Sequence, residues 1–172
     1  MAYLLDANVF IEANRRHYGM DFCPAFWQWL IDQNAAGRVF SVEKIGHELR
    51  AGDDHLAEWA VERGASFFLP PDDRMLASLA AISDWAHSQT YRAAAIAAFL
   101  EDADYYLVAY AHAHGHVVVT HEVPSDGVKL IKIPNVCIAF KTKCMTPFEM
   151  LRVAGARFVL GAERGLGLTG LE

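Results

Sequence analysis

The sequence has few cysteines, no long apolar segment and no excess of positive charge, and each of these shortages excludes a class of protein. Its three cysteines are an odd number at wide spacing, which argues against a disulfide framework and favours reduced thiols. No apolar run approaches the roughly 18 residues that a membrane-spanning helix needs. The net charge of −6 argues against a protein that coats nucleic acid through many lysine and arginine contacts to phosphates.

The start of the chain does not resemble a secretory signal, because it lacks a basic stretch and reaches a carboxylate at Asp6. Together with the cysteine usage, this predicts a cytoplasmic protein that does not enter the membrane. A length of 172 residues with 53% hydrophobic residues suits one domain with a buried core. We expect this domain at residues 1–155, followed by a flexible tail at 156–172.

Positive charge gathers in one part of the chain. Residues 123–160 contain six lysines and arginines against two acids, so the rest of the chain is strongly acidic. This division fits an acidic, cation-binding pocket beside a basic surface, while a randomly charged surface is the alternative explanation.

Short hydrophobic runs predict strands. Residues 3–5 and 117–120 read as buried strands because they are apolar or β-branched, and residues 67–69 read as a further strand. Residues 130–133 and 136–140 are each expected to supply an edge strand or an extended segment.

Helical periodicity fills most of the chain between these strands. Helices are expected at 24–34, at 42–50, twice within 73–100, and at 102–114, where Gly115 ends the last one. Short strands that alternate with helices predict an α/β domain with a mainly parallel central sheet flanked by helices.

Acidic residues stand where such a fold would bring them together. Asp6 and Glu122 come just after predicted buried strands, and ligands of parallel sheets gather at the carboxyl ends of the strands. Asp104 opens a predicted helix and shares a face with Val108 and Ala111, so it is expected to point toward the core. A carboxylate in that position needs a partner.

Each acid also has an ordinary structural explanation. Asp6 suits a helix N-cap, Asp104 suits the positive end of a helix dipole, and Glu48 suits a solvated helix surface. Taken together, however, these acids would repel one another at one edge of the sheet. A divalent cation would relieve that repulsion best.

Four motifs, in order along residues 3–122, resemble those of the PIN-domain nucleases. The stretch 3–11 (YLLDANVFI) is similar to the opening strand of that family, and 46–52 (GHELRAG) is similar to its second acidic motif. The stretch 104–111 (DYYLVAYA) resembles the third motif. The stretch 118–122 (VVTHE) resembles the fourth, with Glu122 where many relatives carry Asp. Residues 134–150 resemble a less characterised branch of PIN-like proteins.

The resemblance implies a ribonuclease that hydrolyses phosphodiester bonds with Mg²⁺ or Mn²⁺, ions that prefer oxygen ligands. The implied metal-binding residues are Asp6, Glu48, Asp104 and Glu122. Of these, Glu122 would bind directly or through water, and its arm, longer than that of Asp, would shift or loosen the second metal site. Asn8 and Thr120 would orient ligands or water from a second layer.

The resemblance also implies partners. The basic segment would guide RNA toward the acidic pocket through Lys129, Lys132, Lys141 and Lys143. Many relatives are toxins of toxin–antitoxin pairs, which implies a cognate antitoxin protein and a homodimer.

Two other functions remain open. One is a PIN-like scaffold that has lost catalysis and binds RNA or a protein. The other is a phosphatase of the haloacid dehalogenase type with Asp6 as nucleophile, although that family normally carries a second Asp where this chain has Asn8.

Overall fold

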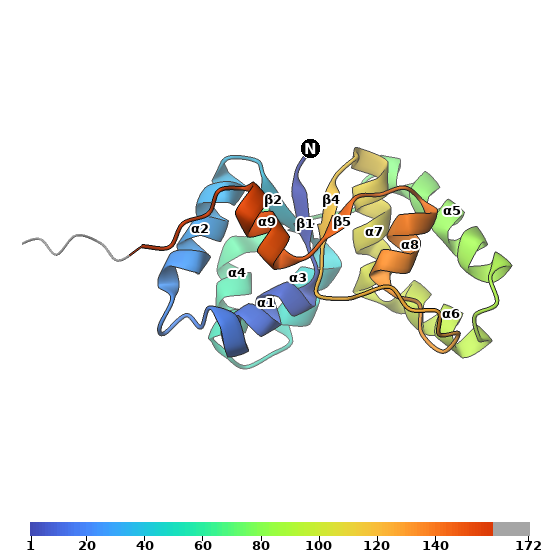
Figure 1. The fold of residues 1–172 in the computed structure, drawn as a ribbon, viewed down its shortest axis with the longest axis horizontal. Coiled ribbons are helices and arrows are strands. Elements are labelled where there is room, and N and C mark those ends of the chain that lie inside the picture. The colour runs from blue at the N-terminus through green and yellow to red at the C-terminus, as the bar shows by residue number, and fades with distance from the viewer. Residues whose placement is uncertain (160–172) are drawn as a thin grey trace, which may run out of the picture.

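The strands of the protein form a single parallel sheet. The computed structural model describes residues 1–159, and it places five strands in the order β3-β2-β1-β4-β5 (Figure 1). They are β1 (Tyr3–Leu5), β2 (Val39–Val42), β3 (Phe68–Leu69), β4 (Val117–Val119) and β5 (Cys144–Met145). All four neighbouring pairs are parallel. The expected α/β class with a mainly parallel sheet is therefore confirmed.

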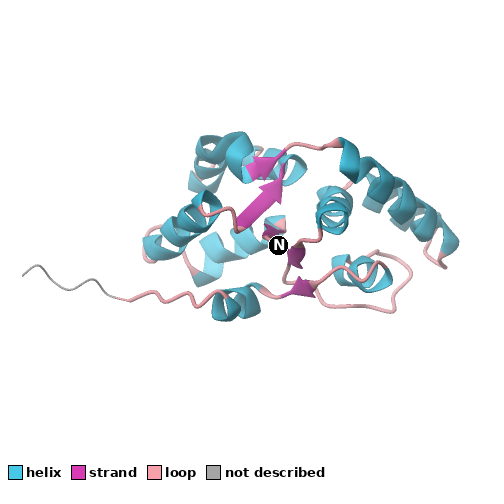
Figure 2. Cartoon of the chain, turned by 90° about the horizontal axis from the view of Figure 1, so that it is seen from above, coloured by secondary structure: helices cyan, strands magenta, loops and turns pink. Residues whose placement is uncertain are grey.

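Helices connect these strands and cover the sheet. Those in the described residues are α1 (Ala7–Glu12), the π-helix η1 (Ala13–His17), α2 (Pro24–Ala35), α3 (Glu43–Arg50), α4 (His55–Phe67), α5 (Asp73–Ser88), α6 (Ala93–Glu101), α7 (Ala103–His114), α8 (Ile133–Ala139) and α9 (Pro147–Val153). Figures 1 and 2 show α1, α2 and α4 on one side of the strands and α5, α6 and α7 on the other. None of the helices in this part of the chain is long and apolar enough to cross a membrane.

The strand order places β1 in the middle of the sheet, between β2 and β4. The chain runs from β1 outward through β2 to β3, and then returns to the other side of β1 to form β4 and β5. The connections therefore change direction between β1 and β4. In open parallel sheets, ligands bind beyond the carboxyl ends of the strands at such a point.

The segment after β4 differs from its expected structure. Residues 136–140, expected to be extended, belong mostly to α8, and residues 130–132 are loop. The extended interpretation of 136–140 was wrong because Pro134 occupies the first turn of a helix, where proline is tolerated. Ile133, Val136 and Cys137 then form a buried stripe at helical spacing.

Other boundaries moved because short elements carry weak patterns. The segment 42–50 divides into the end of β2 at Val42 and the helix α3, and neither β2 nor β5 was expected. Core packing also continues past residue 155. The centroid of the Phe158 ring lies 5.8 Å from that of the Tyr18 ring and 6.1 Å from that of the Phe26 ring. Of the expected tail, residues 160–172 lie outside the described residues.

Candidate functional site

Asp6 is held at the carboxyl edge of the sheet by the pairing of β1 with β4. Its backbone N–H donates to the carbonyl oxygen of Val119 at 3.0 Å, so the parallel pairing continues into this residue. Asp6 occupies the N-cap position of α1, but its carboxylate makes no capping hydrogen bond. Instead its Oδ2 accepts a hydrogen bond from the Thr120 hydroxyl at 2.8 Å, and the residue is only 1% exposed. The carboxylate is thus hydrogen-bonded to the segment after β4, while the N–H groups at the start of its own helix lie near it without forming a cap.

Burial makes the charge of Asp6 costly. Desolvation raises the pKa of this carboxyl to about 6, and the charge of Glu122 adds to the rise. The Thr120 hydroxyl and the backbone N–H groups of Asn8 and Ala7 lower the pKa, but they offset only part of the effect. Asn8 itself is exposed in the first turn of α1.

Thr120 connects two of the predicted site residues. Its hydroxyl donates to Asp6 and accepts the backbone N–H of Glu122 at 3.1 Å. The Glu122 carboxylate forms an ion pair with Lys132, and its other oxygen accepts the Ile133 N–H at 2.8 Å. Glu122 therefore ties the 123–132 loop to the first turn of α8, and its charge is already balanced by a lysine.

Asp104 lies half-buried in the first turn of α7, above the fully buried Val108 and Ala111 of the same face. The charges that act on its pKa are all carboxylates: Asp6, Asp102, Glu122 and Glu48. Desolvation, followed by these charges, raises the pKa of Asp104 to about 8. The fold thus holds this carboxyl where its ionised form has no basic partner among residues 1–159.

Asp102 belongs to the same group of acids, although the sequence interpretation did not include it in the site. It is the N-cap of α7, and its Oδ1 accepts the backbone N–H of Asp104 at 3.1 Å. Its charge also raises the pKa of Glu48. The signal was present in the run 101–104 (EDAD), since an acid two residues before Asp104 at a helix start is a typical cap.

Glu48 reaches this group from α3. Its side chain is exposed, yet the pKa is raised by partial desolvation and by the charges of Asp102 and Asp6. Lys44, one helical turn earlier, lowers the pKa. We call the five acids Asp6, Glu48, Asp102, Asp104 and Glu122 the acidic cluster.

The donor chemistry of the acidic cluster suits a hard divalent cation, because carboxylate oxygens are the ligands that Mg²⁺ and Mn²⁺ prefer. In this structure, however, the carboxylates of the cluster do not surround one common point. Within residues 1–159, no three His, Cys, Asp or Glu side chains stand in a metal-binding arrangement. Coordination of one ion would thus require carboxylates to rotate toward one another.

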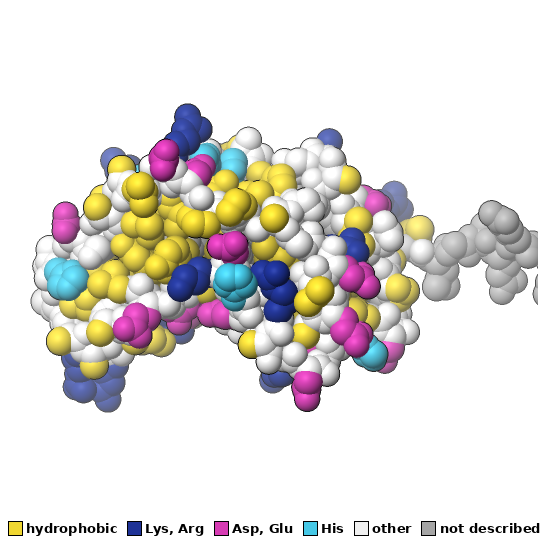
Figure 3. Space-filling view, turned by 180° about the vertical axis from the view of Figure 1, so that it is seen from behind, with side chains coloured by type: hydrophobic (Ala, Val, Ile, Leu, Met, Phe, Trp, Pro, Cys, Tyr) yellow, Lys and Arg dark blue, Asp and Glu magenta, His cyan; other side chains and the backbone are white. Residues whose placement is uncertain are grey.

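The four lysines predicted to bind RNA do not form one surface. Lys132 pairs with Glu122, and Lys129 is exposed in the 123–132 loop. Lys141 and Lys143 precede β5 and line a pocket with Met1 and Gly115, which stand before β1 and β4. They therefore lie at the amino edge of the sheet, opposite to the acidic cluster, and their position does not favour the predicted guiding role. On the face in Figure 3, Lys and Arg side chains are scattered among acids.

Comparison with known proteins assigns the chain to a family. The family model described as "Domain of unknown function (DUF4411)" matches residues 3–158. No curated protein and no solved structure matches the chain. The matched range includes all the helices and strands described above and the whole acidic cluster. The chain therefore belongs to the DUF4411 family.

Proposed function

We propose that this chain is a divalent-metal-dependent ribonuclease of the PIN-like type, with the acidic cluster as its active site. The observation that carries the proposal is geometric. Acids from four separate segments lie near enough for their charges to act on one another, where the connections of the parallel sheet change direction, and the most buried of them, Asp6, is hydrogen-bonded to Thr120 beyond β4. Such a point is the usual ligand site of an open parallel sheet.

The residues of the cluster would divide the work. Asp6, Glu48 and Asp104 would hold Mg²⁺ or Mn²⁺, which supplies activation of water and neutralisation of the scissile phosphate. Thr120 fixes the carboxylate of Asp6 through its hydroxyl. Asp102 fixes the turn that carries Asp104 by capping α7. These two are positioning residues that keep the ligands in place.

Glu122 would take part only after a rearrangement. In its present contacts it anchors the 123–132 loop through Lys132 and Ile133. A direct role as a ligand would require Lys132 to release it. A toxin role, a cognate antitoxin, a homodimer and a cytoplasmic location belong to the same proposal and rest on the sequence alone.

A scaffold that binds RNA or protein without cleaving is the second candidate. The pairing of Glu122 with Lys132 favours it, because one of the four predicted ligands is already neutralised. The raised pKa of Asp104 favours the nuclease instead, since a scaffold has no use for an uncompensated carboxyl.

The two candidates are separated by a cleavage assay on mixed-sequence single-stranded RNA, with Mg²⁺, Mn²⁺ or EDTA. We expect the wild type to cleave with metal and not with EDTA. Asp6→Asn should abolish cleavage, while Asp21→Asn, which changes an exposed aspartate outside the cluster, should leave it intact. If the purified wild type, free of any bound inhibitor, cleaves with neither ion, the scaffold is correct. Normal cleavage by Asp6→Asn would show that the site is misplaced.

A further inference from the structure

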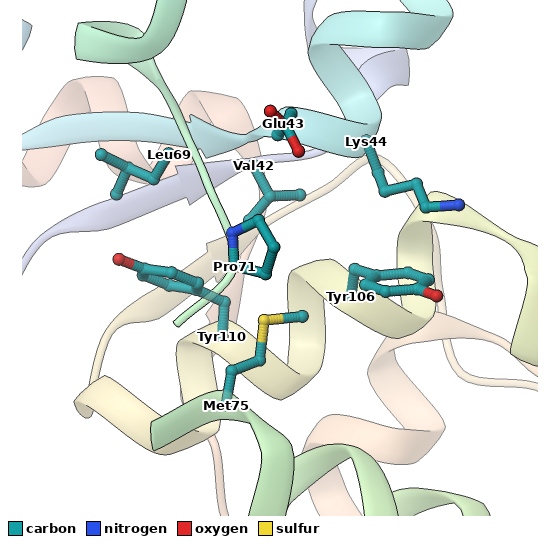
Figure 4. A pocket seen from close by; sticks show the side chains of 8 residues that line it. All are labelled: Val42, Glu43, Lys44, Leu69, Pro71, Met75, Tyr106 and Tyr110. Atoms are coloured by element: carbon teal, nitrogen blue, oxygen red, sulfur yellow. The ribbon is translucent and has the colours of Figure 1, made fainter. Parts of the chain in front are cut away.

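A pocket lies beside the acidic cluster on the same edge of the sheet. Val42 and Leu69, the last residues of β2 and β3, form one wall (Figure 4). Met75 of α5 and the rings of Tyr106 and Tyr110 form the opposite wall. The two tyrosines are four residues apart on α7 and so share one face of the helix. The cavity volume is about 60 Å³, which is room for a few water molecules or for part of one planar ligand.

Lys44 connects this pocket to the acidic cluster. Its Nζ lies 4.7 Å from the centroid of the Tyr106 ring, within the range of a cation–π contact. The same ammonium group lowers the pKa of Glu48, so it acts on both the pocket and the cluster. Lys44 is exposed and forms no salt bridge in the part of the chain that the structure describes. One available cation therefore stands between an aromatic pocket and a set of carboxylates.

We propose that this pocket binds an unpaired base of single-stranded RNA and that Lys44 binds the phosphate of the same nucleotide. The inference rests on the proposed function, because the RNA is the substrate of the neighbouring cluster. Tyrosine rings bind bases by stacking, and only an unpaired base can leave its strand to reach them. Leu69 and Met75 would exclude water from the base, and the Glu43 carboxylate at the rim would accept hydrogen bonds from its N–H groups.

The binding test uses a fluorescein-labelled ten-nucleotide RNA and measures anisotropy with Ca²⁺, and again with EDTA, so that cleavage does not enter. Tyr106→Leu keeps an apolar side chain but removes the ring. It should weaken binding by about 5- to 150-fold, the range for loss of one base stack. Tyr106→Phe should bind as the wild type does. Lys44→Met should weaken binding and lower its dependence on salt concentration.

Two controls make the result specific. Tyr91→Leu removes a half-buried tyrosine from the segment before α6, outside the pocket, and should bind as the wild type does. The second control replaces the RNA with a strand of the same length that lacks its bases; this strand should bind weakly, and equally to the wild type and Tyr106→Leu.

The proposal is overturned if Tyr106→Leu binds the RNA as tightly as the wild type does. It is also overturned if the abasic strand binds as tightly as the RNA. If the protein cleaves no RNA but passes this binding test, the proposed ribonuclease function is wrong and the base-binding pocket stands. If the protein cleaves RNA but fails the binding test, the ribonuclease function stands and the base-binding pocket is wrong.

Discussion

At the level of single residues, Asp104 is a half-buried acid whose ionised form is balanced by no basic group in the part of the chain that the structure describes. Its pKa is about 8 in the folded protein against an ordinary value of 3.8, so the folded state binds this proton more tightly than the unfolded state does. The contribution of this bound proton to the stability of the folded state is fully present below about pH 4, and it is lost as the pH rises toward 8. Asp6, with its pKa raised to about 6, acts in the same direction.

We therefore expect the melting temperature of the metal-free protein, measured in EDTA, to decrease as the pH is raised from 5 to 8. Asp104→Asn removes the titrating group, so its melting temperature should fall less over the same range and should exceed that of the wild type at pH 8. Parallel curves for the two proteins would contradict the assignment of this charge to Asp104.

The same residue tests the metal site directly. Asp104→Asn takes one carboxylate from the cluster, so its affinity for Mn²⁺ in calorimetric titration should fall about tenfold or more. Asp21→Asn, the exposed control, should bind Mn²⁺ as the wild type does. Equal affinities for all three proteins would remove Asp104 from the list of ligands.

At the level of elements, α3 carries Glu48 and must lie close to β3. Gly46 permits this contact, because a Cβ atom there would lie 2.7 Å from Cγ of the buried Phe68 and 3.0 Å from its Cβ. Gly46→Ala should therefore reduce the free energy of unfolding by about 1–3 kcal/mol, the usual cost of overpacking. Urea denaturation measures this loss.

Gly52→Ala is the matched control for that contact. The nearest atoms to its added Cβ lie 3.5 Å away, so the change in stability should stay within about 0.5 kcal/mol. If Gly46→Ala is as stable as Gly52→Ala, the approach of α3 to β3 is looser than the structure indicates.

At the level of the whole molecule, the two edges of the sheet carry different charges. RNA at the carboxyl edge would meet Lys44 but not Lys141 or Lys143, which lie at the amino edge. Lys44→Gln should therefore lower the slope of log affinity against log salt by about one, while the double change at Lys141 and Lys143 leaves it unchanged. Titrations at several salt concentrations measure the slope. If only the double variant lowers the slope, the RNA binds at the amino edge instead.

Local signals in the sequence were enough to predict the fold class and the places of the main acids along the chain. The buried runs that became β1 and β4 are apolar, and the helix that became α7 ends at Gly115 in the left-handed conformation. These signals are local, so they survive without knowledge of the tertiary structure. It follows that Asp6 and Glu122 stand just beyond two strands, as the pattern predicted. By contrast, the two-residue strand β5 and the seven-residue helix α8 are too short for periodicity to distinguish.

Contacts between distant side chains could not be predicted in this way. The bond between Thr120 and Asp6 joins residues 114 positions apart, and no periodicity encodes such a contact. The same holds for the pairing of Lys132 with Glu122 and for the pocket between β2, β3 and α7. These contacts follow from the order of strands in the sheet and from the direction of each side chain. Both are set by how all the segments pack together, because burial of the whole apolar surface selects one arrangement.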